Sequence, residues 1–483
     1  MSQFAKSPPD SGARGPTLLF NITHGFQARM LLRSEIAEGL LARGARLVIV
    51  SGAAREPYFV KEFSHPQISL EEMPEKFSKL ESNLINLRQY FLMNPSLGAT
   101  LNHKNEAFRR ERPSRYWFAR AVNSVLGRIP PLRRAYQAGE AFAYPGSEFD
   151  ELLKRYQPDL VVTGTPGLNR NDMHLMRAAR RAGIETATVM LSWDNLTSKG
   201  YMGARPDHLL VWSDLMAEEA EQYHNFPRDR IQWSGAAQFD LYHGVRERLD
   251  REAWRRRHNI PPGRPLIVYG TINPAILPHE GNVLQQIVDA CKSDAFSVKP
   301  YLWIRLHPQV VRGYYSRSLG PIKALAGPDV YIEEPPVQSE KLPWDLPKKD
   351  AIHLAELMAA ADILVTTSST LSIDAACAGT PIINVFFDGD TPVHPALSAQ
   401  RFMYYTHYAH ILNTGGIAKS MTIDDFIRQA KTYIEKPETD HAGRENILRQ
   451  QMNRLDGQAG VRTAEQLWEL AVRRSNRAAK DEK

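Results

Sequence analysis

The sequence predicts an α/β protein made of two doubly wound domains, each with a parallel sheet covered by helices on both faces. Three observations indicate this class. Short apolar strands alternate with helical segments along most of the chain, which is typical of βαβ units. At 483 residues the chain is longer than one hydrophobic core usually supports. The segment IPPGRP, at residues 260–265, separates two halves of similar size.

We expect a cytoplasmic protein. No apolar run approaches the ~20 residues of a membrane span, and the N-terminus lacks the apolar stretch of a signal peptide. Cys291 and Cys377 lie in apolar helical contexts without a neighbouring cysteine, so we interpret both as core thiols. The expected divisions are a disordered leader at 1–15, a first domain at 16–255 with a helical basic insertion at about 74–144, a second domain at 263–420, and C-terminal helices with a charged tail at 421–483.

The first domain opens with a strand at Thr17–Asn21, the turn ITHGFQAR, a helix at Met30–Arg43 and a second strand at Arg46–Ser51. This order is the beginning of a parallel, doubly wound sheet. His24 follows the first strand, at the sheet edge where ligands bind in such folds. The turn lacks the GxGxxG pattern of dinucleotide-binding domains.

The predicted insertion accounts for the net positive charge of the chain. Residues 101–140 hold nine Lys or Arg against three Glu, which equals the net charge of +6 for the whole chain. One interpretation is a solvated arginine-rich face over an aromatic core. The alternative is a surface for an anionic acceptor, or peripheral contact with the inner face of the plasma membrane. No nucleic-acid recognition motif accompanies the charge, so nucleic acid is not an expected partner.

Four further strands are predicted in the first domain, at Asp159–Thr163, Glu185–Met190, Asp207–Trp212 and Ile231–Gly235. The loops after two of them are polar. They contain Asn169, Arg170 and Asp172 in one loop and Trp193, Asp194, Asn195 and Lys199 in the next. Because loops at one edge of a parallel sheet converge, we expect these side chains to share one cleft.

The second domain is predicted to contain strands at Leu266–Tyr269, Tyr301–Leu306 and Pro328–Glu333. Its main feature is the stretch AADILVTTSSTLSIDAACAGTPIINVFFD, residues 360–388, which predicts a strand at Ile363–Thr366, a hydroxyl-rich turn, a helix and a further strand. The turn residues Ser368, Ser369 and Thr370 either cap the helix or bind an anion at its start.

Three motifs carry a resemblance to a known family. They are RLHP after a strand, TTSSTLSIDAACAGTPIINV, and DGQAGVR before the last helix. Together they resemble GT-B glycosyltransferases, in which two Rossmann-like domains face each other across a cleft. The branch they resemble contains CDP-glycerol glycerophosphotransferases and bacterial surface-polysaccharide transferases.

This resemblance implies that the second domain binds a nucleotide-activated sugar donor. It assigns Ser368, Ser369 and Thr370 to the donor phosphates, and Asp374 to the ribose hydroxyls. It also assigns His307 to the diphosphate. Arg305, two residues earlier on the same face of the strand, is either a donor contact or a charge on an edge strand. Many relatives have Glu in place of Asp374 and a glycine-rich turn in place of the Ser-Ser-Thr turn, which leaves the donor open.

No metal or other cofactor is expected. The DxD match at residues 388–390 reads as a turn. Charge on the leaving diphosphate would then be balanced by helix dipoles and cationic side chains. The candidates for a general base on the acceptor hydroxyl are Asp194, His24 and Asp172. The candidate anchors for an acidic acceptor are Arg29, Arg33, Arg170 and Lys199.

Three functions remain open at this stage. The first is transfer of a sugar or polyol-phosphate from the nucleotide-activated donor to a cell-surface glycan or lipid-linked acceptor. The second is a UDP-sugar 2-epimerase of the same fold. The third is a non-catalytic nucleotide-sugar-binding or scaffold protein of polysaccharide assembly.

Overall fold

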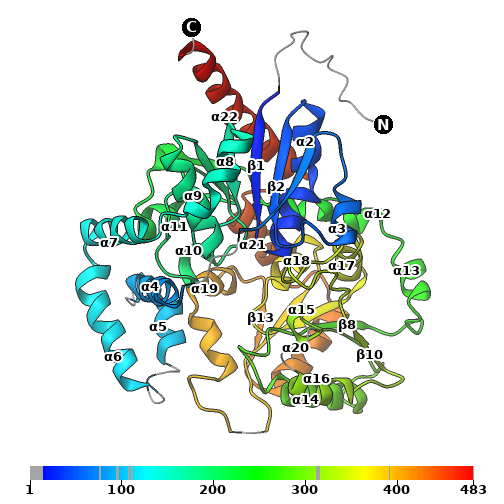
Figure 1. The fold of residues 1–483 in the computed structure, drawn as a ribbon. Helices are drawn as coiled ribbons and strands as arrows, with labels where there is room; N and C mark the ends of the chain where they lie inside the picture. The colour runs from blue at the N-terminus through cyan, green and yellow to red at the C-terminus, as the bar shows by residue number, and fades with distance from the viewer. Residues whose placement is uncertain are drawn as a thin grey trace.

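The fold was analysed in a computed structural model, shown in Figure 1. The structure describes residues 15–74, 78–93, 97–106, 109, 112–311, 316–390 and 392–481. The predicted leader lies outside these residues except for Gly15.

The first sheet has seven parallel strands in the order β3-β2-β1-β4-β5-β6-β7. Its strands are β1 (Thr17–Ile22), β2 (Arg46–Ser51), β3 (Ile68–Glu72), β4 (Leu160–Thr163), β5 (Thr186–Val189), β6 (His208–Val211) and β7 (Ile231–Trp233). The central strands are short runs of fully buried residues because helices cover both faces. The order reverses between β1 and β4, which is where open α/β sheets bind ligands.

The second sheet has six parallel strands in the order β10-β9-β8-β11-β12-β13. Its strands are β8 (Leu266–Gly270), β9 (Tyr301–Arg305), β10 (Val330–Glu333), β11 (Ile363–Thr366), β12 (Ile382–Val385) and β13 (Ala418–Ser420). Here the order reverses between β8 and β11, so the turn after β11 lies at the corresponding position of its sheet.

Helices fill the connections. Those up to the second sheet are α1 (Gly25–Gln27), η1 (Ala28–Leu32), α2 (Glu35–Ala42), α3 (Pro57–Glu62), α4 (Lys79–Gln89), η2 (Tyr90–Leu92), α5 (Ala99–Glu106), α6 (Pro113–Val122), η3 (Asn123–Gly127), α7 (Pro130–Ala143), η4 (Ser147–Phe149), α8 (Asp150–Tyr156), α9 (Arg170–Arg181), α10 (Asn195–Ser198), α11 (Asp214–His224), η5 (Arg228–Arg230), η6 (Ala237–Tyr242), α12 (Val245–Arg248) and α13 (Arg251–Arg257). The later ones are α14 (Glu280–Lys292), α15 (Pro308–Val311), α16 (Ser316–Lys323), α17 (Lys348–Ala360), α18 (Leu371–Cys377), η7 (Ala399–Tyr404), α19 (Thr406–Leu412), α20 (Ile423–Glu435), α21 (His441–Met452) and α22 (Ala459–Asp481).

The strands differ from expectation at two edges. β3 and β13 were not predicted, because both are short edge strands of mixed polarity. The predicted helix at Met30–Arg43 was wrong in its continuity: η1 ends before Arg33, and α2 starts afresh with Ser34 as its N-cap. Arg33 is thereby turned toward the second domain, where it forms a buried ion pair with Asp345.

Helices α4 to α7 lie between β3 and β4 and form the left margin of the molecule in Figure 1. A buried ion cluster attaches them to the sheet layer. Arg88 of α4 and Arg177 of α9 both donate to Glu140 of α7, Arg177 at 3.0 Å. Arg133 is also buried and donates to the carbonyl of Tyr223 at 3.0 Å. Part of the positive charge in this region is therefore internal.

The last helix returns to the first domain. Leu467 and Leu470 of α22 join the hydrophobic core beneath β1 and β2, and Arg43 pairs with Glu465 at 2.8 Å. Asp240 accepts hydrogen bonds from the first two amides of α22, at 3.1 and 2.7 Å. Within the DGQAGVR motif, Asp456 accepts from the amide of Gln458 at 3.0 Å and pairs with Arg462 at 2.7 Å. The motif and Asp240 together fix the start of α22.

One hydrophobic core continues from the first sheet into the second. It includes Leu209 and Val211 of β6 together with Leu266 and Val268 of β8. The two sheets therefore belong to one packed body, and the loops at the carboxyl ends of their strands meet.

Candidate active site

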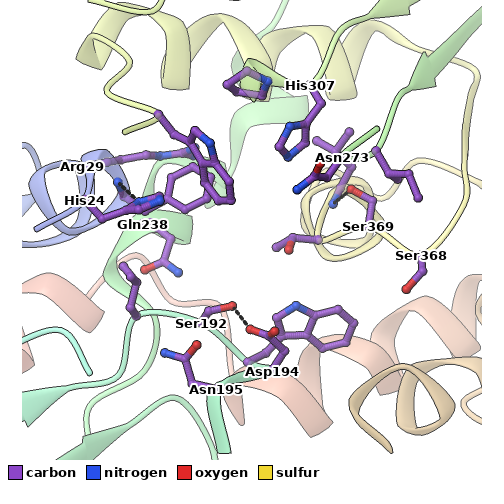
Figure 2. A pocket seen from close by; sticks show the side chains of 18 of the residues that line it. His24, Arg29, Ser192, Asp194, Asn195, Gln238, Asn273, His307, Ser368 and Ser369 are labelled. Carbon is purple, nitrogen blue, oxygen red and sulfur yellow. Dashed lines mark hydrogen bonds between the residues drawn. The ribbon is translucent and has the colours of Figure 1, made fainter. Parts of the chain in front are cut away.

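The loops after the strands of both sheets enclose a cavity of about 980 Å³. This volume lies near the upper end of the roughly 300–1,000 Å³ typical of ligand sites. Figure 2 shows the labelled side chains arranged around one space: His24 and Arg29 on one side, His307, Asn273, Ser368 and Ser369 on the other, and Ser192, Asp194 and Asn195 below.

The second-domain wall contains the turn between β11 and α18. Ser368, Ser369 and Thr370 all line the cavity. Thr370 occupies the N-cap position of α18 but makes no side-chain capping bond, whereas Ser369 Oγ accepts from the amide of Leu371 at 3.3 Å. Capping therefore involves only one of the three hydroxyls. Because α18 has seven residues, its dipole is a small contribution.

Tyr408 braces this turn from the protein interior. Its hydroxyl donates to Asn384 at 2.6 Å, lies 3.1 Å from Ser372 Oγ and accepts from the amide of Ser369 at 3.4 Å. Burial raises the pKa of Tyr408 well above its usual value, so the phenol stays protonated. The sequence analysis did not identify Tyr408, because it lies 39 residues after Ser369.

His307 follows β9 and lines the same wall. Its Nδ1 accepts from the amide of Gln309 at 3.2 Å, so in the neutral ring the proton is on Nε2. Burial lowers the pKa of His307 to about 4, which keeps the ring neutral near pH 7. His307 therefore presents a neutral N–H donor, suited to a phosphate oxygen.

Asp374 lies deeper in the cavity wall, on α18. Tyr242 donates to its Oδ1 at 2.6 Å. Burial raises the pKa of Asp374, and the charge of Arg29 across the cavity opposes this rise. Arg29 has no ion pair within the described part of the chain, and its Nε is buried without a hydrogen-bond partner. A cation from the first domain is thus available to an anionic ligand.

Arg305 was predicted to contact the donor, or else to be a charge on an edge strand. β9 is an interior strand, so the second interpretation was wrong. Although Arg305 borders the cavity, its guanidinium is held by Glu333 and donates twice to Asp350, at 2.8 and 2.7 Å. We therefore interpret Arg305 as a brace between β10 and α17.

The first-domain wall begins with His24, the N-cap of α1. Its Nδ1 accepts from the amide of Phe26 at 3.2 Å, which places the neutral-ring proton on Nε2. The ring packs edge-to-face on Trp344, with centroids 4.5 Å apart, and Trp344 makes the same contact with His307 at 5.3 Å. An indole from the second domain thus lies between the two histidines.

Trp344 belongs to a loop that crosses the cleft, residues 338–347, which we call the strap. Asp345 of the strap forms a fully buried ion pair with Arg33 at 2.6 Å and accepts from Tyr58 at 2.6 Å. The amide of Gly25 donates to Pro343 at 2.8 Å. A Cβ at Gly25 would lie 2.3 Å from the Trp344 carbonyl, so this approach requires glycine. Arg33 therefore serves the domain interface and not an acceptor.

Asp194 follows β5 and is the best-organised carboxylate in the cavity. Ser192 and Ser198 donate to its two oxygens, at 2.7 and 2.6 Å, and Lys199 Nζ lies 3.5 Å away. Burial by itself would raise the pKa of Asp194, but Lys199, the His407 side chain and the Ser198 hydrogen bond hold it well below its usual range. Asp194 is therefore ionised at any physiological pH.

Two residues around Asp194 were missed by the sequence analysis. His407 of α19 lines the cavity and packs against Trp193, with ring centroids 4.9 Å apart. Burial lowers its pKa to about 4. Lys104 of α5 also lines the cavity and donates to the carbonyl of Ser198 at 3.2 Å. Burial and the nearby Lys199 lower the pKa of Lys104 to about 8. Neither residue lies in a motif, and the fold alone brings them to this site.

Two other predicted residues are bound by partners within the fold. Asp172 does not border the cavity; it is fully buried and binds Asn21, at 2.7 Å, and Thr165. Burial raises its pKa to about 6. Arg170 borders the cavity but pairs with Glu81 at 2.8 Å and with Glu148 at 3.2 Å.

The DxD match turns its carboxylates toward its own domain. Asp388 accepts from the amide of Ala399 at 2.7 Å and contacts His279 at 2.9 Å, while Asp390 is bound by Gln286. Gly389 has φ +79°, as a turn requires. Among the described residues, no group of three or more His, Cys, Asp or Glu side chains is arranged to hold a metal ion.

No protein-family model matches the sequence, and no curated protein sequence matches it. Solved structures share the fold. A glycosyltransferase from Rickettsia africae superposes with a TM-score of 0.51 at 13% identity, over 95% of this chain and 99% of that chain. The UDP-GlcNAc 2-epimerase from Neisseria meningitidis, bound to UDP-GlcNAc, gives 0.53 at 12% identity, over 94% and 100%. MnaA from S. aureus, in a co-structure with UDP, gives 0.54 at 10% identity, over 92% and 94%.

At 10–13% identity these likenesses establish the fold alone. The chain has two Rossmann-like domains facing across a cleft, which is the GT-B arrangement that the motifs predicted. The narrower resemblance to CDP-glycerol glycerophosphotransferases stays a prediction.

Proposed function

We propose that the protein is a glycosyltransferase that moves a sugar or polyol-phosphate from a nucleotide-activated donor to an acceptor hydroxyl on a glycan or lipid-linked molecule. The observation that carries the proposal is the asymmetry of the cavity. Neutral hydroxyl and imidazole donors line the second-domain wall, and an ionised carboxylate with lysines lines the first-domain wall. Transfer requires two such halves, one for the donor phosphates and one to activate the acceptor.

In this proposal the diphosphate of the donor lies against the Ser368, Ser369 and Thr370 hydroxyls and the Nε2–H of His307. A neutral imidazole suits this role, because it can donate a hydrogen bond from Nε2 to the leaving phosphate oxygen. Arg29 approaches from the opposite wall and offers positive charge to the same group. Asp374 is then left for the ribose, through the oxygen that Tyr242 does not bind.

Asp194 is the best candidate for the group that receives the acceptor proton. Its competitors are weaker for definite reasons: Asp172 does not reach the cavity, and His24 uses its Nδ1 lone pair on Phe26. The low pKa of Asp194 makes it a weak base but guarantees its ionised form. Lys104 and Lys199 add positive charge beside it, which favours an acidic or phosphate-bearing acceptor.

UDP-GlcNAc 2-epimerase is the second candidate, because epimerases are among the solved structures that share the fold. Epimerisation needs the nucleotide sugar but no acceptor. Incubation with UDP-GlcNAc alone in D₂O separates the two functions. Formation of the C2 epimer with deuterium at C2 would support the epimerase and contradict the transferase.

The donor half is tested by thermal shift with UDP, CDP, GDP, TDP and CMP. A ligand that binds only the folded protein raises Tm with its concentration. We expect one nucleoside diphosphate to do so, and S368A/S369A to weaken the shift. Thr422→Ala is the matched control, because it removes a helix-capping hydroxyl of the same domain that does not border the cavity. If no nucleotide shifts Tm, the proposed donor site is wrong.

Turnover decides among the remaining alternatives. A nucleotide that shifts Tm should also support sugar transfer to a glycan or lipid-linked acceptor, monitored by nucleotide release. Binding without turnover across a panel of nucleotide sugars and acceptors would instead support a non-catalytic role.

A further inference from the structure

The outer face of α6, η3 and α7 exposes large apolar side chains to solvent. Its apolar members are Trp117, Phe118, Val125, Ile129 and Phe142. Trp117 is 62% exposed and Phe142 is 90% exposed. The opposite side of α6 is buried through Tyr116 and Ala119. Helix α6 therefore packs on the protein through one face, and the apolar side chains on its exposed face do not contribute to that packing.

The segment that carries these side chains is also positively charged, and the three-residue spacing of Trp117 and Arg120 makes them neighbours on the surface of α6. Residues 112–139 contain no Asp or Glu. Four arginines of this segment are exposed, namely Arg112, Arg120, Arg128 and Arg134. Within the described chain none of the four has an ion pair, and the buried Arg133 donates to the backbone carbonyls of Gly127 and Tyr223. The outer face thus combines exposed aromatic rings with uncompensated positive charge.

We propose that this outer face docks the protein on an anionic lipid bilayer. Aromatic rings settle in the headgroup region, and arginines at the same depth attract anionic headgroups. Apolar and basic residues on one exposed helical face are the combination that holds proteins in the plane of a membrane interface. No helix among the described residues is both long and apolar enough to cross a membrane, so this contact would be peripheral.

Charge disfavours a second copy of the chain as the occupant. Self-association through this face would bring the four exposed arginines of one copy toward those of the other, with no carboxylate between residues 112 and 139 to separate them. Five large apolar side chains also exceed what a purely phosphate-binding surface uses. An anionic bilayer can bind both the arginines, through its headgroups, and the apolar side chains, through its interfacial region.

Helix α5 joins the surface to the cavity. Lys104 of α5 lines the cavity, and Leu101 of α5 belongs to the same hydrophobic cluster as Ala119 of α6. Docking would hold this region against the membrane, as a lipid-linked acceptor requires. This link to the acceptor rests on the proposed function, but the docking itself does not, and the two are measured separately.

The test uses the full chain and vesicles of phosphatidylcholine with or without about 30% phosphatidylglycerol. We expect sedimentation with the anionic vesicles and weaker sedimentation at high salt. Brominated lipid should quench wild-type tryptophan emission more than that of Trp117→Phe. R120Q/R128Q should weaken the partition coefficient by about tenfold or more, since each arginine near the surface contributes favourably. W117S/F118S should weaken it at both low and high salt.

Two control variants match the changes in kind. R256Q/R257Q removes two exposed arginines from α13, which lies on the opposite side of Figure 1, and Val298→Ser removes an exposed apolar side chain of the second domain. Both should bind vesicles as the wild type does.

Three results would overturn the docking proposal. The first is that the wild type does not bind anionic vesicles. The second is that the control variants lose vesicle binding as much as the docking variants do. The third is a dimer in sedimentation velocity that W117S/F118S abolishes. Nucleotide thermal shifts of the docking variants should stay unchanged. A protein that binds vesicles but no nucleotide would contradict the proposed function and leave the docking intact.

Discussion

The two walls of the cavity are built in different ways. On the second-domain wall, Ser368, Ser369, Thr370 and Asp374 come from one continuous segment, braced by Tyr408. On the first-domain wall, the reactive groups come from separate loops and helices, including Lys104 in the region between β3 and β4. The hydroxyl turn is therefore encoded by one short segment, whereas the surroundings of Asp194 are assembled from distant parts of the chain. If the proposed roles are right, the local turn serves the diphosphate that all donors share, and the assembled wall serves the acceptor.

The largest expected effect is on the first-domain wall. Asp194→Asn keeps the shape and one of the two serine hydrogen bonds, but it removes the charge proposed to receive the acceptor proton. General-base removal costs about 10²–10⁴-fold, so we expect kcat to fall by about 10³-fold with nucleotide affinity unchanged. Steady-state kinetics and nucleotide titration check this. If Asp194→Asn weakens nucleotide binding and leaves kcat intact, the roles of the walls are reversed.

The second effect concerns the strap that joins the walls. Asp345→Ala removes the carboxylate bound by Arg33 and Tyr58 and leaves a buried guanidinium with Glu62 as its remaining partner. Breaking a buried ion pair costs about 3–5 kcal/mol, and we expect a loss of that order in the free energy of unfolding, measured by urea denaturation.

Asp150→Ala is the control for the strap. Its ion pair with Arg181 is half exposed on both sides, so the expected loss is below about 1 kcal/mol. Equal losses in the two variants would show that the strap does not hold the domains together. Asp345→Asn, which retains a hydrogen-bonding side chain, provides a milder variant if Asp345→Ala fails to fold.

The third effect appears only as a function of pH. Glu219 is buried beneath the first-domain wall, and burial together with the charge of Asp194 raises its pKa to about 8. Between about pH 4.5 and 8 the unfolded chain loses this proton while the folded protein keeps it. Stability contributed by the raised pKa is therefore lost as pH rises through this window.

Glu219→Gln should remove that loss. The difference in Tm, variant minus wild type, should grow from pH 5 to pH 8 and then level off, as followed by circular dichroism. Glu218→Gln, at the neighbouring position on α11, should show no comparable growth. A constant difference across the range would mean that Glu219 is ionised in the folded protein.

The smallest effect belongs to the second-domain wall. Loss of hydrogen bonds to a charged phosphate costs about 1.5–3 kcal/mol each, but water can replace part of this at an open turn. We expect S368A/S369A to weaken nucleotide affinity by about tenfold, with kcat for bound substrate nearly unchanged. Isothermal titration measures the nucleotide affinity. A loss of kcat as large as that of Asp194→Asn would show that the two walls do not have separate roles.

The two parallel sheets and most of their strands could be predicted from the sequence. Strands such as β2 and β11 were predicted with their observed bounds, because a run of apolar residues between turn signals is a local property. The hydroxyl turn after β11 was found for the same reason. Edge strands β3 and β13 and the break at Arg33 escaped prediction, since their conformation depends on pairing with distant segments.

Only the tertiary structure decided which charged groups are available for chemistry. Nothing in the local sequence distinguishes Arg29 from Arg33, Arg170 and Arg305 as a candidate ligand-binding cation. In the structure, however, Arg33, Arg170 and Arg305 pair with carboxylates from distant parts of the chain. Desolvation and long-range ion pairing determine whether a side chain is charged and whether it can bind a ligand. Neither can be inferred from the residues next to it in the sequence. For this reason the hydroxyl turn after β11 could be found in the sequence, while the grouping of Lys104, Asp194 and His407 could be found only in the folded chain.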